Sequence, residues 1–145
     1  MVELVTQLFI NKMIQNGHKL TNSIRSFHRL SGGGPSGLRP IHLKNCLGTE
    51  HRDEVLEHCT SIVNLLAKGE APRSLAPFLA GANLTAIPKK DNDIRPVAVG
   101  EALRRLTAKC LCISYKDQIA SFFSPLQIGV RQPVGNEAGI ETARQ

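Results

Sequence analysis

Apolar residues recur at three- and four-residue spacing in several stretches of this chain, a pattern that predicts amphipathic helices. The expected helices cover residues 1–16, 22–30, 51–68, 101–120 and 136–144. Gly17 is predicted to end the first helix, and Thr21 or Asn22 to cap the second. Residues 72–77, which begin and end with proline, predict a connector with one helical turn, and residues 127–133 an extended segment.

Helices 51–68 and 101–120 have the clearest apolar stripes, which predicts that both pack against a core. In the first, early acidic residues and a terminal Lys68-Gly69 fit the two ends of a helix. Its stripe consists of Val55, Leu56, Cys59, Ile62, Val63 and Leu66. The stripe of the second consists of Leu103, Leu106, Cys110 and Ile113, with Arg105, Lys109 and Lys116 toward another side.

Between these helices the sequence predicts a β-hairpin. A short apolar strand ends at Ile87-Pro88, a polar turn follows, and a second strand runs through residues 97–99. The turn residues Asp91, Asn92 and Asp93 have side chains that bond to their own backbone. Because proline has no amide donor, Pro88 and Pro96 are expected at strand ends or on a free edge. The fold class is therefore α+β, mainly helical with one β-hairpin.

The composition limits the function classes without choosing one. The 145 residues suffice for a compact core, and an aromatic content of 4% predicts that Leu, Ile, Val and Ala fill it. The net charge of +6 favours an anionic partner. No apolar run reaches the roughly 18 residues of a membrane span, and the N-terminal segment lacks the basic start of a signal peptide. We therefore expect an intracellular protein, nuclear or cytoplasmic, without a membrane partner.

The sequence predicts neither a metal site nor a catalytic group. His42, Cys46, His51, His58 and Cys59 are close in sequence, but their spacing fits no zinc motif. No Asp-Asp pair occurs. The cysteines are Cys46, Cys59, Cys110 and Cys112, and all are expected to be reduced thiols, with Cys59 and Cys110 on apolar helix faces.

Cations gather on and after the hairpin. Lys89, Lys90 and Arg95 lie at its tip, and Arg104, Arg105 and Lys109 follow on the helix, against the acids Asp91, Asp93 and Glu101. Arginine can hold two phosphate oxygens at once, and lysine acts as a compact point charge. A basic hairpin above a basic helix is typical of a site for polyphosphate or a nucleic-acid backbone. A solvated, merely charged hairpin is the alternative.

Residues 31–37 form a glycine-rich break in the helical pattern. Glycines allow backbone amides to approach an anion closely, so the segment is a candidate phosphate cradle. It lacks the Gly-Lys-Ser/Thr ending of a nucleoside-triphosphate loop and the strand before it that a dinucleotide site needs. A flexible loop is the alternative.

Several ordered motifs together resemble the fingers of reverse transcriptases, those of non-LTR retrotransposons above all. The hairpin motifs are Ala86-Ile87-Pro88-Lys89-Lys90, Ile94-Arg95-Pro96-Val97 and Leu103-Arg104-Arg105-Leu106 with Lys109. Upstream, Gly32-Gly33-Gly34-Pro35-Ser36-Gly37-Leu38-Arg39-Pro40 and His42-Leu43 resemble the family's Gly-rich block; downstream, so do Pro125-Leu126-Gln127-Ile128-Gly129-Val130 and Gly135-Asn136-Glu137-Ala138. The resemblance covers residues 32–145, with N-terminal helices in residues 1–31.

The resemblance implies a fingers subdomain of an RNA-directed DNA polymerase, cut before the palm. Lys89 and Arg95 would hold the triphosphate of an incoming deoxynucleotide, with Lys90 a looser contact. Arg39 would contact template phosphate, and Arg104, Arg105 and Lys109 would lie near the template or fix the hairpin. The intact relative would use Mg²⁺, primer-template and palm aspartates, which are missing here, so this chain is not expected to polymerise nucleotides alone.

Two other interpretations remain open. One is a small basic module that binds RNA or DNA without polymerase ancestry, in which Arg104, Arg105 and Lys109 would dominate. The other is a structural domain whose charge only aids solubility. In addition, many family members have Gly in the turn where this chain has Asp91-Asn92-Asp93. That departure adds negative charge beside the expected phosphate site.

Overall fold

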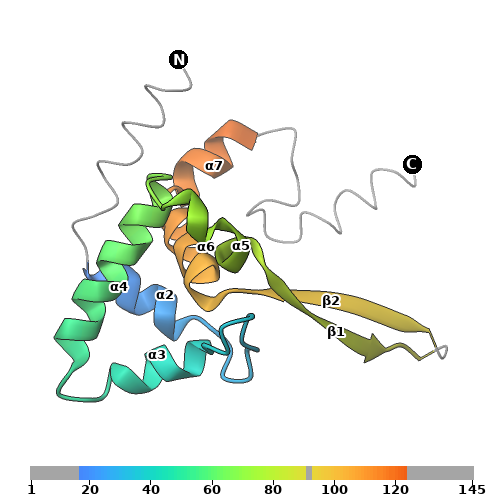
Figure 1. Ribbon diagram of the computed structural model, residues 1–145. Coiled ribbons are helices and arrows are strands. Elements are labelled where there is room, and N and C mark those ends of the chain that lie inside the picture. Colours follow the sequence, from blue (N-terminus) through green and yellow to red (C-terminus); the bar gives the residue numbers. More distant parts are fainter. Residues whose placement is uncertain (1–16, 91–92, 124–145) are drawn as a thin grey trace. The chain divides into compact units, whose positions relative to one another are not determined.

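The computed structural model describes residues 17–90 and 93–123 (Figure 1). The chain forms two compact units, residues 1–113 and 114–145, so the sequence boundary between residues 31 and 32 lies inside the first unit. In order, the elements are α2 (Gly17–Arg25), α3 (Pro40–Cys46), α4 (Arg52–Ala67), η1 (Arg73–Leu75), α5 (Ala76–Ala80), β1 (Ala82–Pro88), β2 (Ile94–Gly100), α6 (Ala102–Ser114) and α7 (Lys116–Phe123). The predicted class is confirmed: α+β, mostly helical, with one antiparallel hairpin.

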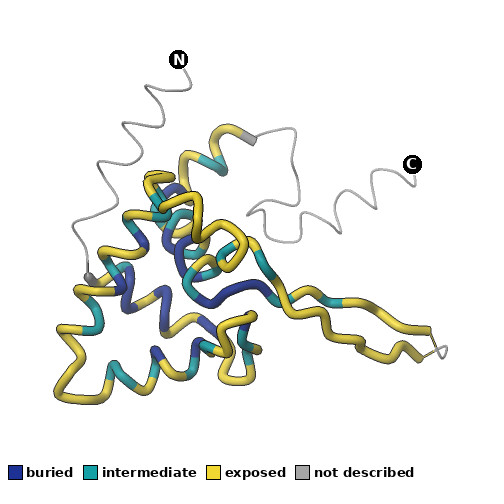
Figure 2. Tube along the Cα trace, in the orientation of Figure 1, coloured by how far each residue is buried: buried dark blue, intermediate teal, exposed yellow. Residues whose placement is uncertain are grey.

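The core of the first unit lies where α2, α3, α4 and α6 meet (Figure 2). Ile24 on α2 and Leu106 on α6 are completely buried. Around them pack Leu20, Phe27, Leu43, Cys59, Val63 and Cys110. As expected from the composition, this core is aliphatic, with a single phenylalanine. The two buried thiols were predicted, and burial raises the pKa of both Cys59 and Cys110, as it does for a thiol that serves as a small apolar group. All four cysteines are free.

Helix α4 follows its prediction almost to the residue. Asp53 and Glu54 occupy its first turn, where carboxylates interact favourably with the helix dipole. At its end Gly69 adopts a φ of 70°. The Gly69 amide donates to the carbonyl of Leu66 and the Glu70 amide to that of Leu65, which together make a Schellman cap. One position of the predicted stripe is wrong, because Ile62 is 36% exposed.

Helix α2 differs from its prediction at both ends. It already includes Gly17, and it stops at Arg25 instead of Leu30. Thr21 and Asn22, which were predicted as caps, lie inside the helix. The predictions for residues 1–16, 127–133 and 136–144 lie outside the described residues.

The proline-containing connector is more helical than expected. It holds the 3₁₀ turn η1 and the short helix α5, which extends beyond residue 77 to Ala80. Pro77 lies in the first turn of α5, where a missing amide donor costs no helical hydrogen bond. The two prolines that predict a connector, Pro72 and Pro77, therefore lie at the starts of η1 and α5.

Helix α6 is shorter than the predicted helix 101–120. It ends at Ser114, and α7 begins at Lys116. Its buried side consists of Ala102, Leu106, Thr107 and Cys110, whereas Ile113 is 40% exposed. The buried stripe was thus predicted correctly at Leu106 and Cys110 and wrongly at Ile113. Thr107 is accommodated in the interior because its hydroxyl donates to the Leu103 carbonyl at 3.0 Å.

The hairpin is confirmed. Strands β1 and β2 pair in antiparallel register from Ala82↔Gly100 to Pro88↔Ile94. Pro88 ends β1, and Pro96 lies within β2, where a two-stranded sheet leaves each strand one free edge, as predicted. Nearly all of the hairpin is exposed, and only its base at Gly100 is buried. Among the described residues, no helix is long and apolar enough to cross a membrane.

The burial of Leu106 predicts the largest stability loss on α6. Leu106→Ala is expected to lower the free energy of unfolding by about 3 kcal/mol, since it removes a completely buried side chain and leaves a cavity. Ile113→Ala on the same helix should cost about 1 kcal/mol or less, because much of that side chain stays in water. Urea denaturation followed by circular dichroism measures both. Equal losses would contradict this description of the core.

Candidate anion site at the hairpin tip

The strand register brings the predicted nucleotide-binding residues together at the hairpin tip. Arg95 on β2 lies directly opposite Ile87 on β1. Two residues further toward the turn, the Lys89 amide donates to the Asp93 carbonyl at 2.8 Å, so these two residues continue the pairing. Because side chains alternate between faces along a strand, Lys89 and Arg95 share the face that Ile87 and Asp93 also occupy. The expectation that Lys89 and Arg95 lie on neighbouring antiparallel chain segments is met.

A hollow of about 410 Å³ opens at this tip, and all three predicted cations line it. Its walls are Ile87, Pro88, Lys89, Lys90 and Arg95. Within the described parts of the chain, neither Lys90 nor Arg95 has a side-chain hydrogen bond or an ion pair. Two unpaired cations and a small apolar floor make a concave, positively charged surface open to solvent.

Lys89 is already paired in the absence of an anion. Its ammonium group donates to the carboxylate of Asp93, which also accepts the amide of Ile94 at 2.8 Å. The Lys89 hydrogen bond, followed by that of Ile94, lowers the pKa of Asp93. Asp93 therefore stays ionised below the usual range of an aspartate and occupies one of the cations that an anion would need. Asp91 and Asn92 lie outside the described residues.

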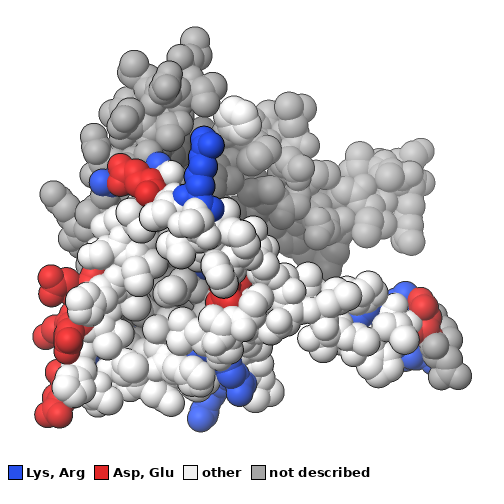
Figure 3. Space-filling view, viewed as in Figure 1, with Lys and Arg blue, Asp and Glu red and all other residues white. Residues whose placement is uncertain are grey.

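Acidic side chains gather along one side of the first unit, whereas acidic and basic atoms lie side by side at the hairpin tip (Figure 3). Exposed carboxylates lie along α4 and just before it, at Glu50, Asp53, Glu54 and Glu57. Among the described residues at the hairpin tip, Lys89, Lys90 and Arg95 are the cations and Asp93 is the acid. No three His, Cys, Asp or Glu side chains within residues 17–90 and 93–123 come together as a metal site requires.

The glycine-rich segment is a loop, and hydrogen bonds fix it to the base of the hairpin. The Glu101 carboxylate accepts the Ser36 amide at 2.6 Å and the Ser36 hydroxyl at 2.7 Å. The Arg105 guanidinium donates to the Gly32 carbonyl at 2.8 Å. Gly34 fits so closely that a Cβ there would lie 2.7 Å from the backbone nitrogen of Glu101. The sequence pattern predicted that the glycines of this segment let backbone amides approach an anion. At Gly34, however, glycine is required because a larger residue would clash with the backbone of Glu101.

The electrostatics of Glu101 follow from these contacts. Burial alone would raise the pKa of this carboxyl group, which is only 6% exposed. The hydrogen bonds from Ser36 and from the Ala102 amide, together with the charge of Arg105, outweigh burial and lower the pKa below its ordinary value. Sequence reasoning counted Glu101 only as a nearby acid and missed its partner Ser36, which is 65 residues away along the chain.

The cations of α6 already make contacts inside the first unit. Arg105 and Lys109 lie over the ring of Phe27, at 5.6 Å and 4.8 Å from its centroid, and Lys109 also reaches the Ser26 hydroxyl at 3.1 Å. Arg104 folds back over Gly100 and approaches the Ala80 carbonyl at 3.4 Å. A nucleic-acid phosphate would have to replace these contacts.

Arg39 is exposed and precedes α3, where Pro40 is the first helical residue. Its amide donates to Nδ1 of His42 at 3.4 Å. The structure thus brings Lys89, Lys90 and Arg95 around one hollow, whereas it does not gather Arg39 and the α6 cations around another.

No protein family, curated protein or solved structure matches this chain. The resemblance to reverse transcriptase fingers therefore rests on the sequence motifs alone and stays a prediction. The tip geometry stands independently of it, because the register and the hollow follow from the structure.

The Glu101–Ser36 contact predicts that the stability difference between the unsubstituted chain and Glu101→Gln depends on pH. Glu101→Gln is expected to lower the free energy of unfolding by about 2 kcal/mol near pH 7, since a buried charged acceptor is lost. A carboxyl group with a lowered pKa in the folded state stabilises the fold above its unfolded pKa of about 4.3, and loses that effect as the pH falls through the folded pKa. The difference in the free energy of unfolding between the two proteins should therefore be smaller at about pH 3 than near pH 7.

Urea denaturation of both proteins at the two pH values measures this effect. Glu57→Gln on the exposed face of α4 is the matched control, and it should change stability by less than about 0.5 kcal/mol at either pH. A Glu101→Gln difference that stays constant or grows on acidification would contradict the assignment.

Proposed function

We propose that the hairpin tip binds the polyphosphate group of a nucleotide, in the manner of the fingers of a reverse transcriptase. The observation that carries the proposal is the convergence of Lys89, Lys90 and Arg95 around one exposed hollow. A triphosphate offers several anionic oxygens within a short length. Three cations on two paired chain segments can each contact a different oxygen of a triphosphate, whereas a single carboxylate offers only two oxygens and one charge.

Each cation has a distinct part in the proposed site. Arg95 presents a planar guanidinium that can bond two phosphate oxygens at once, and the described residues leave it unpaired. Lys89 supplies a point charge on the same face, in exchange for its present contact with Asp93. Lys90 follows Lys89 at the rim and adds a looser contact. Because the site is open to water, screening limits each contact, and binding is expected to weaken as salt rises.

The proposed role is binding and positioning, not bond making. Nucleotide transfer requires carboxylates that hold two metal ions beside the reacting phosphate, and the sequence contains no Asp-Asp pair. Cations that neutralise charge on the leaving pyrophosphate assist such a reaction from the other side. We propose that this chain supplies that half of an RNA-directed DNA polymerase site, with Mg²⁺, primer-template and the acidic residues contributed by a palm.

The contacts of α6 favour the tip over the helix as the anion site. Arg105 and Lys109 stabilise the Gly-rich loop and Phe27, so removing them is expected to damage the fold before it reports on binding. This observation weighs against the interpretation as a basic module in which Arg104, Arg105 and Lys109 dominate. It does not bear on Arg39, which remains a candidate phosphate contact beside the Gly-rich loop.

The direct test removes the two paired cations. Lys89→Ala combined with Arg95→Ala should weaken the binding of dATP or inorganic triphosphate to the 145-residue chain by about tenfold or more, because two charge-assisted contacts are lost. Isothermal titration calorimetry at low salt measures the affinity. Stability should barely change, since both side chains are exposed.

The matched control removes a lysine and an arginine elsewhere. Lys68→Ala with Arg52→Ala takes away the same charge from exposed positions at the two ends of α4. Affinity for triphosphate should fall by less than about twofold through the general loss of positive charge. If both double variants bind triphosphate equally, the tip is not the site.

The Lys89–Asp93 pair predicts a variant that binds more tightly. Asp93→Asn should raise the affinity for triphosphate by about threefold to tenfold, because it frees the Lys89 ammonium and removes a negative charge from the rim. Combined with Lys89→Ala, the same substitution should have a smaller effect, which the double-mutant cycle quantifies by calorimetry. Weaker binding by Asp93→Asn alone would mean that the carboxylate orients the lysine for the ligand instead of competing with it.

A further inference from the structure

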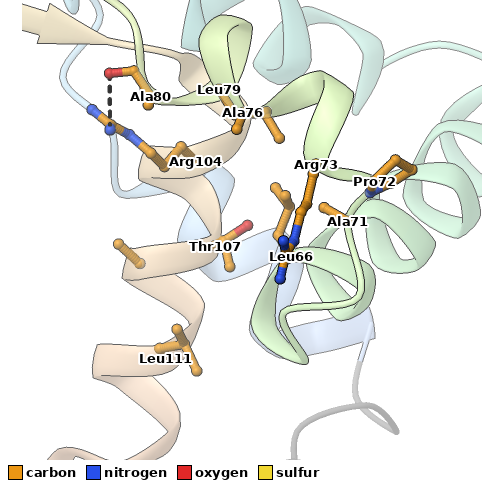
Figure 4. Close-up of a pocket in the computed structure, with 11 residues that line it drawn as sticks. Leu66, Ala71, Pro72, Arg73, Ala76, Leu79, Ala80, Arg104, Thr107 and Leu111 are labelled. Atoms are coloured by element: carbon orange, nitrogen blue, oxygen red, sulfur yellow. Dashed lines mark hydrogen bonds between the residues drawn. The ribbon is translucent and has the colours of Figure 1, made fainter.

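A second hollow, separate from the hairpin tip, lies between α4, α5 and α6 (Figure 4). Its volume is about 490 Å³, within the range of small-molecule sites. Its walls come from the end of α4, from the connector, from α5 and from one side of α6. The apolar part consists of Leu66, Ala71, Pro72, Ala76, Leu79 and Leu111.

Two arginines and no acid line this hollow. Arg73 comes from η1 and Arg104 from α6. Figure 4 shows them apart: the Arg104 guanidinium points to the Ala80 carbonyl, while the Arg73 side chain runs toward Leu66 on the α4 side. Thr107 and Leu111 face the same space from α6. The hollow thus combines an apolar wall with a guanidinium at each of two separate places.

Arg73 is exposed to solvent and supplies one of the two positive charges that line the hollow. Within residues 17–90 and 93–123, its side chain has no hydrogen bond, ion pair or ring contact. Arg104 is held only by one long hydrogen bond. The Thr107 hydroxyl already donates to the Leu103 carbonyl. An unpaired guanidinium beside an apolar wall has a free donor fork for an anionic head and contact area for an apolar body.

We propose that this hollow is a binding site for a small amphiphilic anion, a molecule with one carboxylate-type head and a short apolar body. The head would pair with Arg73, and the body would cover Leu66, Leu79 and Leu111. An uncharged molecule of the same length would leave the guanidinium without a partner, and a cationic one would be repelled by both arginines. The site shares no residue with the hairpin tip, so it is independent of nucleotide binding.

The test compares three probes of equal length on the full 145-residue chain: octanoate, octan-1-ol and octylammonium. Calorimetry should show saturable octanoate binding to one site per chain, with octan-1-ol about tenfold weaker and octylammonium undetectable. Inorganic triphosphate should not displace octanoate. Octanoate and octan-1-ol of equal affinity, or no saturable octanoate binding, would overturn the proposal.

Two variants locate the site. Arg73→Gln should weaken octanoate binding by about tenfold and leave octan-1-ol unaffected, because only the charged contact is lost. Arg52→Gln, an exposed arginine at the start of α4 that does not line the hollow, is the control and should change neither. Ala108→Phe, which fills the hollow from α6, should abolish binding of both probes. An equal loss in Arg73→Gln and Arg52→Gln would contradict the assignment to this hollow.

Discussion

The buried carboxylate of Glu101 is the contact on which the arrangement of the hairpin base depends. It lies where β2 passes into α6, and it binds both the amide and the hydroxyl of Ser36. An ionised group that is 6% exposed is tolerated only when hydrogen bonds and nearby positive charge replace its water. Ser36, the Ala102 amide and Arg105 supply that replacement. The Gly-rich loop is thereby joined to the point where β2 passes into α6.

This anchoring explains why the cations of α6 and the cations of the hairpin tip differ in the contacts that they make. Arg105 and Lys109 extend over the buried ring of Phe27 and reach carbonyl or hydroxyl groups of the chain before α3. Lys89, Lys90 and Arg95 lie beyond the base, on a ribbon with exposed sides, where few partners are within reach. Proximity to the core makes the first group structural. Distance from it leaves Lys90 and Arg95 without a partner among the described residues, while Lys89 pairs with Asp93 of the turn.

The parts of the fold that sequence patterns predicted are the local ones. Helix α4 and the existence of the hairpin follow from apolar periodicity, a Gly cap and a turn, all of which act over a few residues. The start of α2 was predicted too late because Thr21 and Asn22, residue types that favour cap positions, lie inside the helix. The grouping of Lys89 with Arg95 was predictable because hairpin pairing fixes it. The Lys89–Asp93 pair was missed, since the turn residues were considered for backbone bonding and for their overall negative charge, without a specific partner.

The remaining contacts join positions far apart in the chain, which no local pattern shows. Arg105 meets Gly32 across 73 residues, and Lys109 meets Ser26 across 83. The hollow beside Arg73 likewise depends on the position of α5 relative to α4 and α6. A sequence pattern that predicts a connector over residues 72–77 gives no information on that position.

Amide chemical-shift mapping during a titration with inorganic triphosphate tests the central claim most directly, because it reports every backbone position in one experiment. The account predicts the largest shifts at Lys89, Lys90 and Arg95, with Gly32, Arg105 and Lys109 nearly unmoved. Shifts concentrated on α6 and the Gly-rich loop, with the hairpin tip unchanged, would contradict it.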